Sequence, residues 1–262
     1  MTRLIRTELL KLRTMRLTYG LLAVAAALSA LFALLENNRA GRSQSGVPPI
    51  STAAGLATVT TVTGFAMLFA AVLGAIAASG EFRHATATLT YLAAPRRARV
   101  LAAKAVAAAA VGALFGLAAG SIDTGIGLIF AGARGGHVAL SAGTLAGHIA
   151  GATAGAAVLA ALGAALGSLI RSQLAAIIGI FVWAVVIESV IGGLYASVRP
   201  YLPYTVATTL AGARLGNAAF GPAHGLNGGG PLPFAAGLAL LAALTAVIAL
   251  AAARLTLPRD IT

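Results

Sequence analysis

Three ionisable side chains lie within stretches of sequence that are otherwise apolar. Asp123 and Glu188 are acids and His148 is an imidazole, and small or aliphatic residues surround each of them. An acid inside membrane hydrocarbon is costly, so it points to a function such as carrying a proton or contacting a substrate. The other interpretation of both acids is structural, as contacts that hold helices together. His148 has no Cys, Asp or Glu beside it, and we expect a packed, hydrogen-bonded histidine rather than a metal ligand.

A second set of polar residues forms one long insert, residues 79–104, between apolar segments. Pro95 divides the insert, because proline ends a preceding helix and is favoured in the first turn of the next one. Its residue types give no catalytic pattern, and we expect a docking surface for a partner protein. The part of the insert before Pro95 includes Glu81, Phe82, Arg83, His84, Thr86 and Thr88.

Several kinds of chemistry have no motif in the sequence. There is no cysteine, so the chain has neither a disulfide nor a thiol nucleophile. A P-loop requires a glycine-rich turn followed by Lys and then Ser or Thr, but Lys11 precedes Leu12 and Lys104 precedes Ala105. We therefore expect a protein that is not an enzyme and holds no metal or cofactor of its own.

The composition is that of a membrane protein. Hydrophobic residues make up 59% of the chain and charged residues 9%, against about 25% charged in soluble domains. The few charged side chains could not cover a soluble domain of 262 residues. Long apolar runs predict an all-α polytopic protein, a single transmembrane domain with six spans at about residues 19–35, 55–78, 105–130, 139–170, 174–195 and 234–253.

Residues 1–17 predict an amphipathic helix at the membrane surface. Leu4, Ile5, Leu9, Leu12 and Met15 fall on one broad arc of a helix. The polar members of the segment are Arg3, Arg6, Glu8, Lys11 and Arg13. Glu8 lies within the apolar arc, so we expect it to pair with a nearby base or with another segment. The simpler alternative is a basic flank of the first span.

The positions of the bases predict the topology. Thirteen of the eighteen Lys and Arg residues lie in residues 1–17, residues 79–104, Arg171 and the C-terminal tail, and five lie in the opposite loops. Bases concentrate on the cytoplasmic side, so both termini and the insert are predicted to be cytoplasmic. The net charge of +12 is thereby explained without a nucleic-acid partner. This topology places Asp123 and Glu188 toward the outer ends of their spans, near Arg134 and Arg199.

The order of several short segments resembles a known family. These segments are ELLKLRT at residues 8–14, EFRHAT at 81–86, the Pro-Arg-Arg turn at 95–97 before Lys104, Trp183 to Glu188, and RPYLP at 199–203. The chain resembles the membrane subunit of a type 2 ABC exporter, in particular the six-span permeases of actinobacteria. The similarity covers nearly the whole chain.

The resemblance implies specific roles for parts of the chain. Residues 81–92 correspond to the coupling helix, which contacts the ATPase subunit, so the resemblance makes the candidate docking residues Glu81, Phe82, Arg83, His84, Thr86 and Thr88. Residues 3–17 correspond to the amphipathic connecting helix. Parts of 196–232 correspond to short re-entrant helices, although an ordinary outer loop is also compatible with that stretch. It further implies a separate ATPase subunit that binds ATP and Mg²⁺, a second permease copy, identical or paralogous, and a location in the inner or plasma membrane. Two other functions stay open: an ion-coupled secondary transporter that uses Asp123 and Glu188, and a membrane scaffold or immunity protein.

Overall fold

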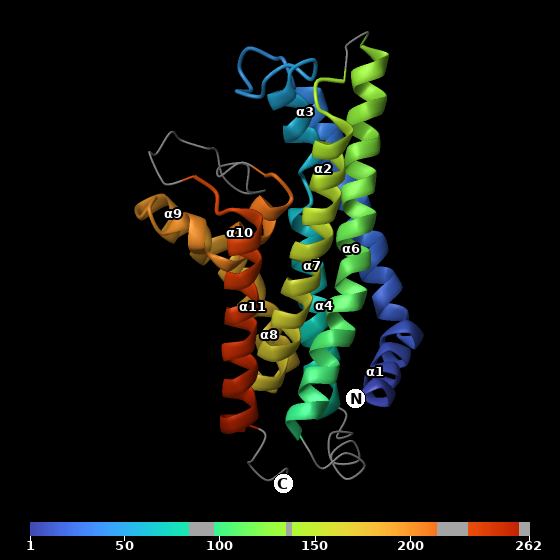
Figure 1. The fold of residues 1–262 in the computed structure, drawn as a ribbon, viewed down its shortest axis with the longest axis vertical. Coiled ribbons are helices and arrows are strands. Elements are labelled where there is room, and N and C mark those ends of the chain that lie inside the picture. Colours follow the sequence, from blue (N-terminus) through green and yellow to red (C-terminus); the bar gives the residue numbers. More distant parts are fainter. Residues whose placement is uncertain (84–96, 135–137, 214–229, 257–262) are drawn as a thin grey trace.

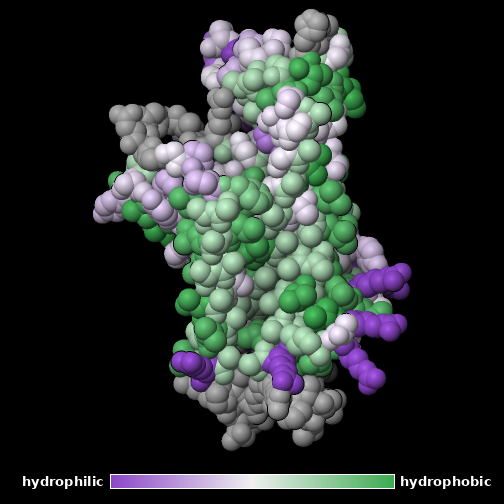
Figure 2. Space-filling model, viewed as in Figure 1, coloured by the Kyte–Doolittle hydropathy of each residue, from purple (hydrophilic) through white to green (hydrophobic). Residues whose placement is uncertain are grey.

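The computed structural model describes residues 1–83, 97–134, 138–213 and 230–256. Within these ranges all the regular elements are helices, so the all-α prediction is confirmed. Six helical segments of the described chain are long and apolar enough to cross a membrane. On the face drawn in Figure 2, hydrophobic side chains cover the middle of the molecule, and strongly hydrophilic ones gather toward its ends. The chain is a polytopic membrane protein.

The N-terminal segment contains two helices separated by one residue. Helix α1 spans Thr2–Thr14 and α2 spans Arg16–Arg39, and between them Met15 has an extended backbone with ψ 116°. Leu12 is buried, whereas the arginines of α1 are exposed, as the amphipathic pattern predicts. Figure 1 shows α1 bent away from the line of α2, at the end of the molecule where the N-terminus lies.

The second span is confirmed, but it is interrupted. Helix α3 covers Ala53–Thr60 and α4 covers Gly64–Arg83, with three non-helical residues between them. At the break, the hydroxyls of Thr60 and Thr61 donate to the Ala57 carbonyl oxygen at 3.3 and 2.8 Å. Such bonds from side chain to backbone compete with the helical ladder and bend helices. The sequence predicted these local bonds as possible, but it did not predict the interruption.

The third and fourth spans are the longest helices. Helix α6 runs from Arg97 to Ala133 and α7 from Ala142 to Ile170. Ser141 caps α7 by accepting a hydrogen bond from the Thr144 amide at 3.1 Å. After α7, Arg171 adopts a left-handed conformation with φ 59°, and a tight turn leads into α8, Gln173–Phe181.

The C-terminal part contains short irregular elements between its two spans. A π-helical stretch, Val182–Ile187, joins α8 to α9, Glu188–Leu194. A single 3₁₀ turn, Arg199–Tyr201, then leads to α10, Pro203–Leu210, and the last span is α11, Phe234–Ala251, with a π-helical extension, Ala252–Thr256. Helix α10 is largely buried and packs against α7 and α11, so this part of 196–232 lies among the spans.

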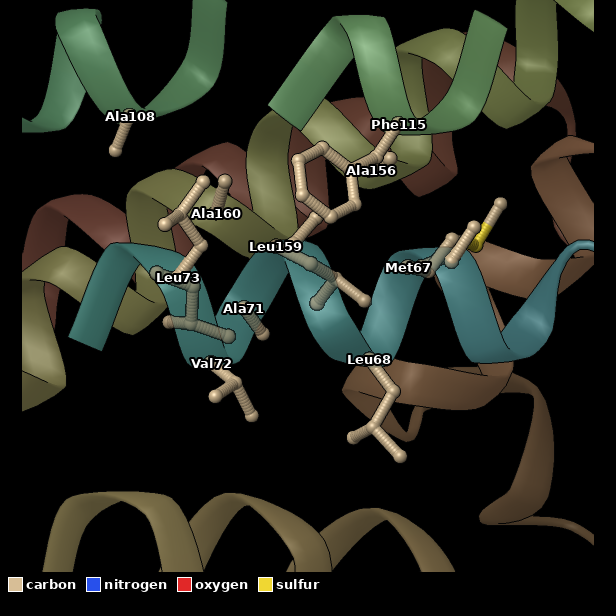
Figure 3. Close-up of a cluster of buried hydrophobic side chains, with 14 of the residues drawn as sticks. Met67, Leu68, Ala71, Val72, Leu73, Ala108, Phe115, Ala156, Leu159 and Ala160 are labelled. Atoms are coloured by element: carbon tan, nitrogen blue, oxygen red, sulfur yellow. The ribbon is translucent and has the colours of Figure 1, made fainter. Parts of the chain in front are cut away.

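The core lies between α4, α6 and α7. Figure 3 shows its large side chains, among them Met67 and Leu73 on α4, beside the small alanines of α7. The helices approach closely because both sides use glycine: a Cβ on Gly74 would lie 1.9 Å from the Ala160 carbonyl oxygen, and one on Gly163 would lie 1.9 Å from that of Ala71. Small residues at such contacts are what allow membrane helices to pack tightly without a hydrophobic driving force.

Candidate functional site

Three helices that are distant in the sequence bring charged side chains together at one end of the molecule. Helix α1 contributes Glu8 and Lys11, which lie nearly one turn apart on the same face. Glu81 lies near the end of α4 and Lys104 lies two turns into α6. In Figure 1 the end of α6 that begins at residue 97 is beside α1. We call Glu8, Lys11, Glu81 and Lys104 the lysine–glutamate cluster.

Each lysine of the cluster contacts both acids. Lys11 Nζ lies 2.7 Å from Glu8 Oε1 and 2.8 Å from Glu81 Oε1. Lys104 Nζ lies 2.9 Å from Glu8 Oε2 and also donates a short hydrogen bond to Glu81 Oε1. Two positive and two negative charges therefore form a neutral set. The pairs join residues 70 and 96 positions apart in the sequence, so the cluster ties α1 to both α4 and α6.

The two lysines differ in their surroundings. The side chain of Lys104 is 5% exposed and that of Lys11 is 43% exposed. Partial burial lowers the pKa of Lys11, but hydrogen bonds and attraction from Glu8 and Glu81 more than offset this effect, so its pKa is raised. Lys104 depends more strongly on its acidic partners, because an unpaired buried ammonium is strongly disfavoured.

The residues predicted for docking and for the interfacial helix have different positions in the structure: some belong to the lysine–glutamate cluster and others do not. Of the predicted docking residues, Glu81 belongs to the lysine–glutamate cluster, and Phe82 and Arg83 lie in the last turn of α4. His84, Thr86 and Thr88 lie outside the described residues. On α1, Arg3, Arg6 and Arg13 are exposed, and Glu8 is 8% exposed with two lysine partners. Glu8 was expected to pair with a nearby base or with another segment, and in the structure it contacts both Lys11 on its own helix and Lys104 on α6.

Glu188 holds the start of α10. Its Oε1 accepts hydrogen bonds from the Tyr204 amide at 2.7 Å and the Trp183 indole at 2.9 Å. Its Oε2 accepts from the amide and the hydroxyl of Thr205 at 2.8 and 2.9 Å. The first amides of a helix have no partner within the helix and carry partial positive charge, so a carboxylate there stabilises the helix. Both oxygens of Glu188 are thus occupied by structural contacts.

Asp123 and His148 lie apart from the lysine–glutamate cluster. Asp123 is fully buried on α6, and its Oδ2 accepts a hydrogen bond from Ser29 on α2 at 3.2 Å. His148 Nδ1 lies 3.0 Å from the Thr60 hydroxyl, which agrees with the expected packed histidine.

Among the residues that the structure describes, neither Asp123 nor Glu188 forms an ion pair with Arg134 or Arg199. Arg134 instead donates to the Asn37 carbonyl at 3.2 Å, and the side chain of Arg199 packs beside Gly192. For Asp123 the reason is helical geometry. Arg134 is eleven residues further along the chain, about 16 Å along the helix axis, so its guanidinium is out of reach of the Asp123 carboxyl group.

The cluster was not predicted from the sequence as a unit. The signal for it was present: the chain has sixteen Arg but only two Lys, and both lysines are in the cluster. Among the residues that the structure describes, no group of three acidic or histidine side chains is arranged to hold a metal ion. The chain matches no protein-family model and no curated protein, so its function has to be argued from these residues.

Proposed function

We propose that the chain is the permease subunit of an ATP-driven ABC exporter, which forms the transmembrane pathway with a second permease copy. ATP and Mg²⁺ belong in this proposal to a separate ATPase subunit. The observation that carries it is the lysine–glutamate cluster. It lies where α4 ends and α6 begins, on either side of residues 84–96. It includes Glu81, the first residue of the segment 81–92 that the resemblance assigns to contact with the ATPase.

The cluster supplies a mechanical reason for this assignment. A force applied to residues 84–96 reaches the chain through the end of α4 and the start of α6, and Glu81 and Lys104 join these two ends directly. Glu8 and Lys11 connect the same two residues to α1. Separating one member of a buried ion pair from its partner is strongly unfavourable. A push from the ATPase would therefore move α1, α4 and α6 as one unit.

The region before the last span also supports the proposal. The short helix α10 packs against α4, α7 and α11 and is capped by Glu188, and it lies in the stretch that the resemblance assigns to re-entrant helices. The same observation weakens the ion-coupled alternative, because Glu188 has no free carboxylate oxygen for a transported ion. A scaffold or immunity protein would not need these ion pairs between the end of α4 and the start of α6.

The proposal is tested by reconstitution with the candidate partner, a P-loop ATPase encoded beside this chain. Co-expression should yield a complex, and ATP should drive transport in vesicles. The double variant Glu81→Arg with Arg83→Glu should lose the complex, because it disturbs both the cluster and the docking segment. The matched control Glu36→Gln alters an acid near the C-terminal end of α2, away from the cluster, and should keep the complex. An intact, ATP-driven complex in the double variant would contradict the docking assignment, and transport driven by a proton gradient without any ATPase would favour the ion-coupled alternative.

A further inference from the structure

Asp123 is a buried acid with one hydrogen-bond partner among the described residues. Its side chain is 0% exposed, and the Ser29 hydroxyl at 3.2 Å from Oδ2 is a neutral and rather distant donor. The other oxygen, Oδ1, has no hydrogen-bond partner among the described residues. Glu188 in comparison accepts four hydrogen bonds, and the acids of the lysine–glutamate cluster face two ammonium groups.

The helices packed against α6 bring no cation to Asp123. Between Tyr19 and Glu36, α2 contains no titratable residue, and residues 53–80 of α3 and α4 contain none either. The lysine–glutamate cluster and Arg254 lie toward the other end of α6; Lys104 is nineteen residues away, about 28 Å along the helix.

Helix α7 contributes one titratable group, His148, whose Nδ1 is hydrogen-bonded to the Thr60 hydroxyl. Thr60 packs against α6 at Gly127, one turn beyond Asp123: a Cβ on Gly127 would be 2.9 Å from the Thr60 methyl group. His148 is therefore the ionisable group nearest to Asp123 by helix register, but its Nδ1 is directed to Thr60 and not to the carboxyl group.

We propose that Asp123 is a proton-binding site in the interior of the membrane domain. An isolated carboxylate in a low-dielectric interior pays a large loss of hydration, and such a group takes up a proton instead. The Ser29 hydroxyl suits the neutral acid, because a hydroxyl can both donate and accept. Loss of the proton would require a donor or a cation that the packing of α2 against α6 does not supply, so release of the proton is linked to separation of these two helices. The inference holds whether or not the chain is an exporter.

The composition of the chain permits a direct test. It contains two aspartates, Asp123 and Asp260, so labelling with carboxyl-¹³C aspartate marks two side chains. Infrared spectra of the labelled protein in lipid bilayers at neutral pH distinguish the C=O stretch of a protonated carboxyl group from the bands of a carboxylate. The variant Asp260→Asn leaves Asp123 as the one labelled side chain.

The labelled protonated-carboxyl band should be present in the wild-type chain and in Asp260→Asn. It should be lost in Asp123→Asn, which also places a neutral side chain of nearly the same shape at the site. In Ser29→Ala the band should persist at a shifted frequency, because the acid stays buried and loses its hydrogen bond. A spectrum of labelled Asp260→Asn that contains carboxylate bands alone at neutral pH would overturn the proposal, and this result needs no variant of the buried site.

Discussion

The lysine–glutamate cluster and the Glu188 site hold buried carboxylates in two different ways. In the cluster, ammonium groups balance the acids, and the pairs join residues up to 96 positions apart on three helices. At Glu188 the partners are amides, a hydroxyl and an indole that lie 5 to 17 residues away. The cluster therefore depends on the relative positions of whole helices, whereas Glu188 fixes one local turn. A change at the cluster should act on several helices, and a change at Glu188 should act mainly on α10.

The largest effect is expected from Lys104→Met. The substitution keeps a long side chain but removes the buried charge, and it leaves Glu8 and Glu81 close together with Lys11 alone. Removing one member of a buried ion pair should lower the free energy of unfolding by about 3 kcal/mol. Denaturant titration in mixed micelles measures this loss, and hydrogen exchange should be faster in α1 as well as in α6.

A surface ion pair in the same chain provides the control. Glu36 and Arg39 are 2.9 Å apart, one turn from each other on α2, with side chains 21% and 56% exposed. Glu36→Gln should change the free energy of unfolding by less than about 1 kcal/mol. Equal effects of Lys104→Met and Glu36→Gln would show that the cluster does not join the helices.

A smaller and more local effect is expected from Glu188→Gln. The oxygen of the new amide can still accept one or two hydrogen bonds. The amide nitrogen cannot accept, so the donors that face it lack an acceptor, and the free energy of unfolding should fall by about 1–3 kcal/mol. The amides of Tyr204 and Thr205 should exchange faster with solvent deuterium, while α1 is unchanged. Ser189→Ala is the neighbouring control, since that hydroxyl donates to Val185 O in the adjoining π-helical stretch and not to Glu188. Faster exchange in α1 would contradict the division between the two regions.

Removing a single donor from Glu188 should have a still smaller effect. Thr205→Val keeps the shape of the side chain and leaves three of the four hydrogen bonds to the carboxylate. The expected loss is about 1 kcal/mol by denaturant titration. Thr209→Val lies one turn later on the same helix and removes a bond to Val206 O, so it controls for the change of residue type. If the two variants are equal, the Thr205 hydroxyl is not an effective partner of Glu188.

The spans were predictable because length and hydropathy determine them almost alone. A membrane segment must satisfy its own backbone, so an apolar run of sufficient length forms a helix whatever its neighbours are. The predicted first span, 19–35, is extended at both ends in the structure to Arg16–Arg39, because polar flanking residues continue the helix into the interface. The interruption at residues 61–63 was not predictable in this way, since it depends on which hydroxyls bond the backbone and on the packing of α10 and α7 around them.

The site was predictable only where the relevant partners are local. The position of Glu8 in the apolar arc of α1 was enough to predict a basic partner, and Lys11 lies three residues away. The pairing with Lys104 depends on how α1 packs against α6, which hydropathy does not determine. For the same reason the capping of α10 by Glu188 was not predicted: the contact requires the chain to fold back after the 3₁₀ turn Arg199–Tyr201.

The least disruptive way to weaken the cluster is to raise the pH. The pKa of Lys11 is raised in the folded protein, so its pairing contributes stability that is fully present below the pKa of an unfolded lysine and is lost as the pH rises through the higher, folded value. The difference in melting temperature between the wild type and Lys11→Met should thus be constant at neutral pH and should close in the strongly alkaline range. Because Lys11 is 43% exposed, solvent screens the pair and the difference should be small. Glu188 has no lysine partner, so the difference between the wild type and Glu188→Gln should not close over that range. If both differences close together, the alkaline change is a general loss of structure and not the titration of Lys11.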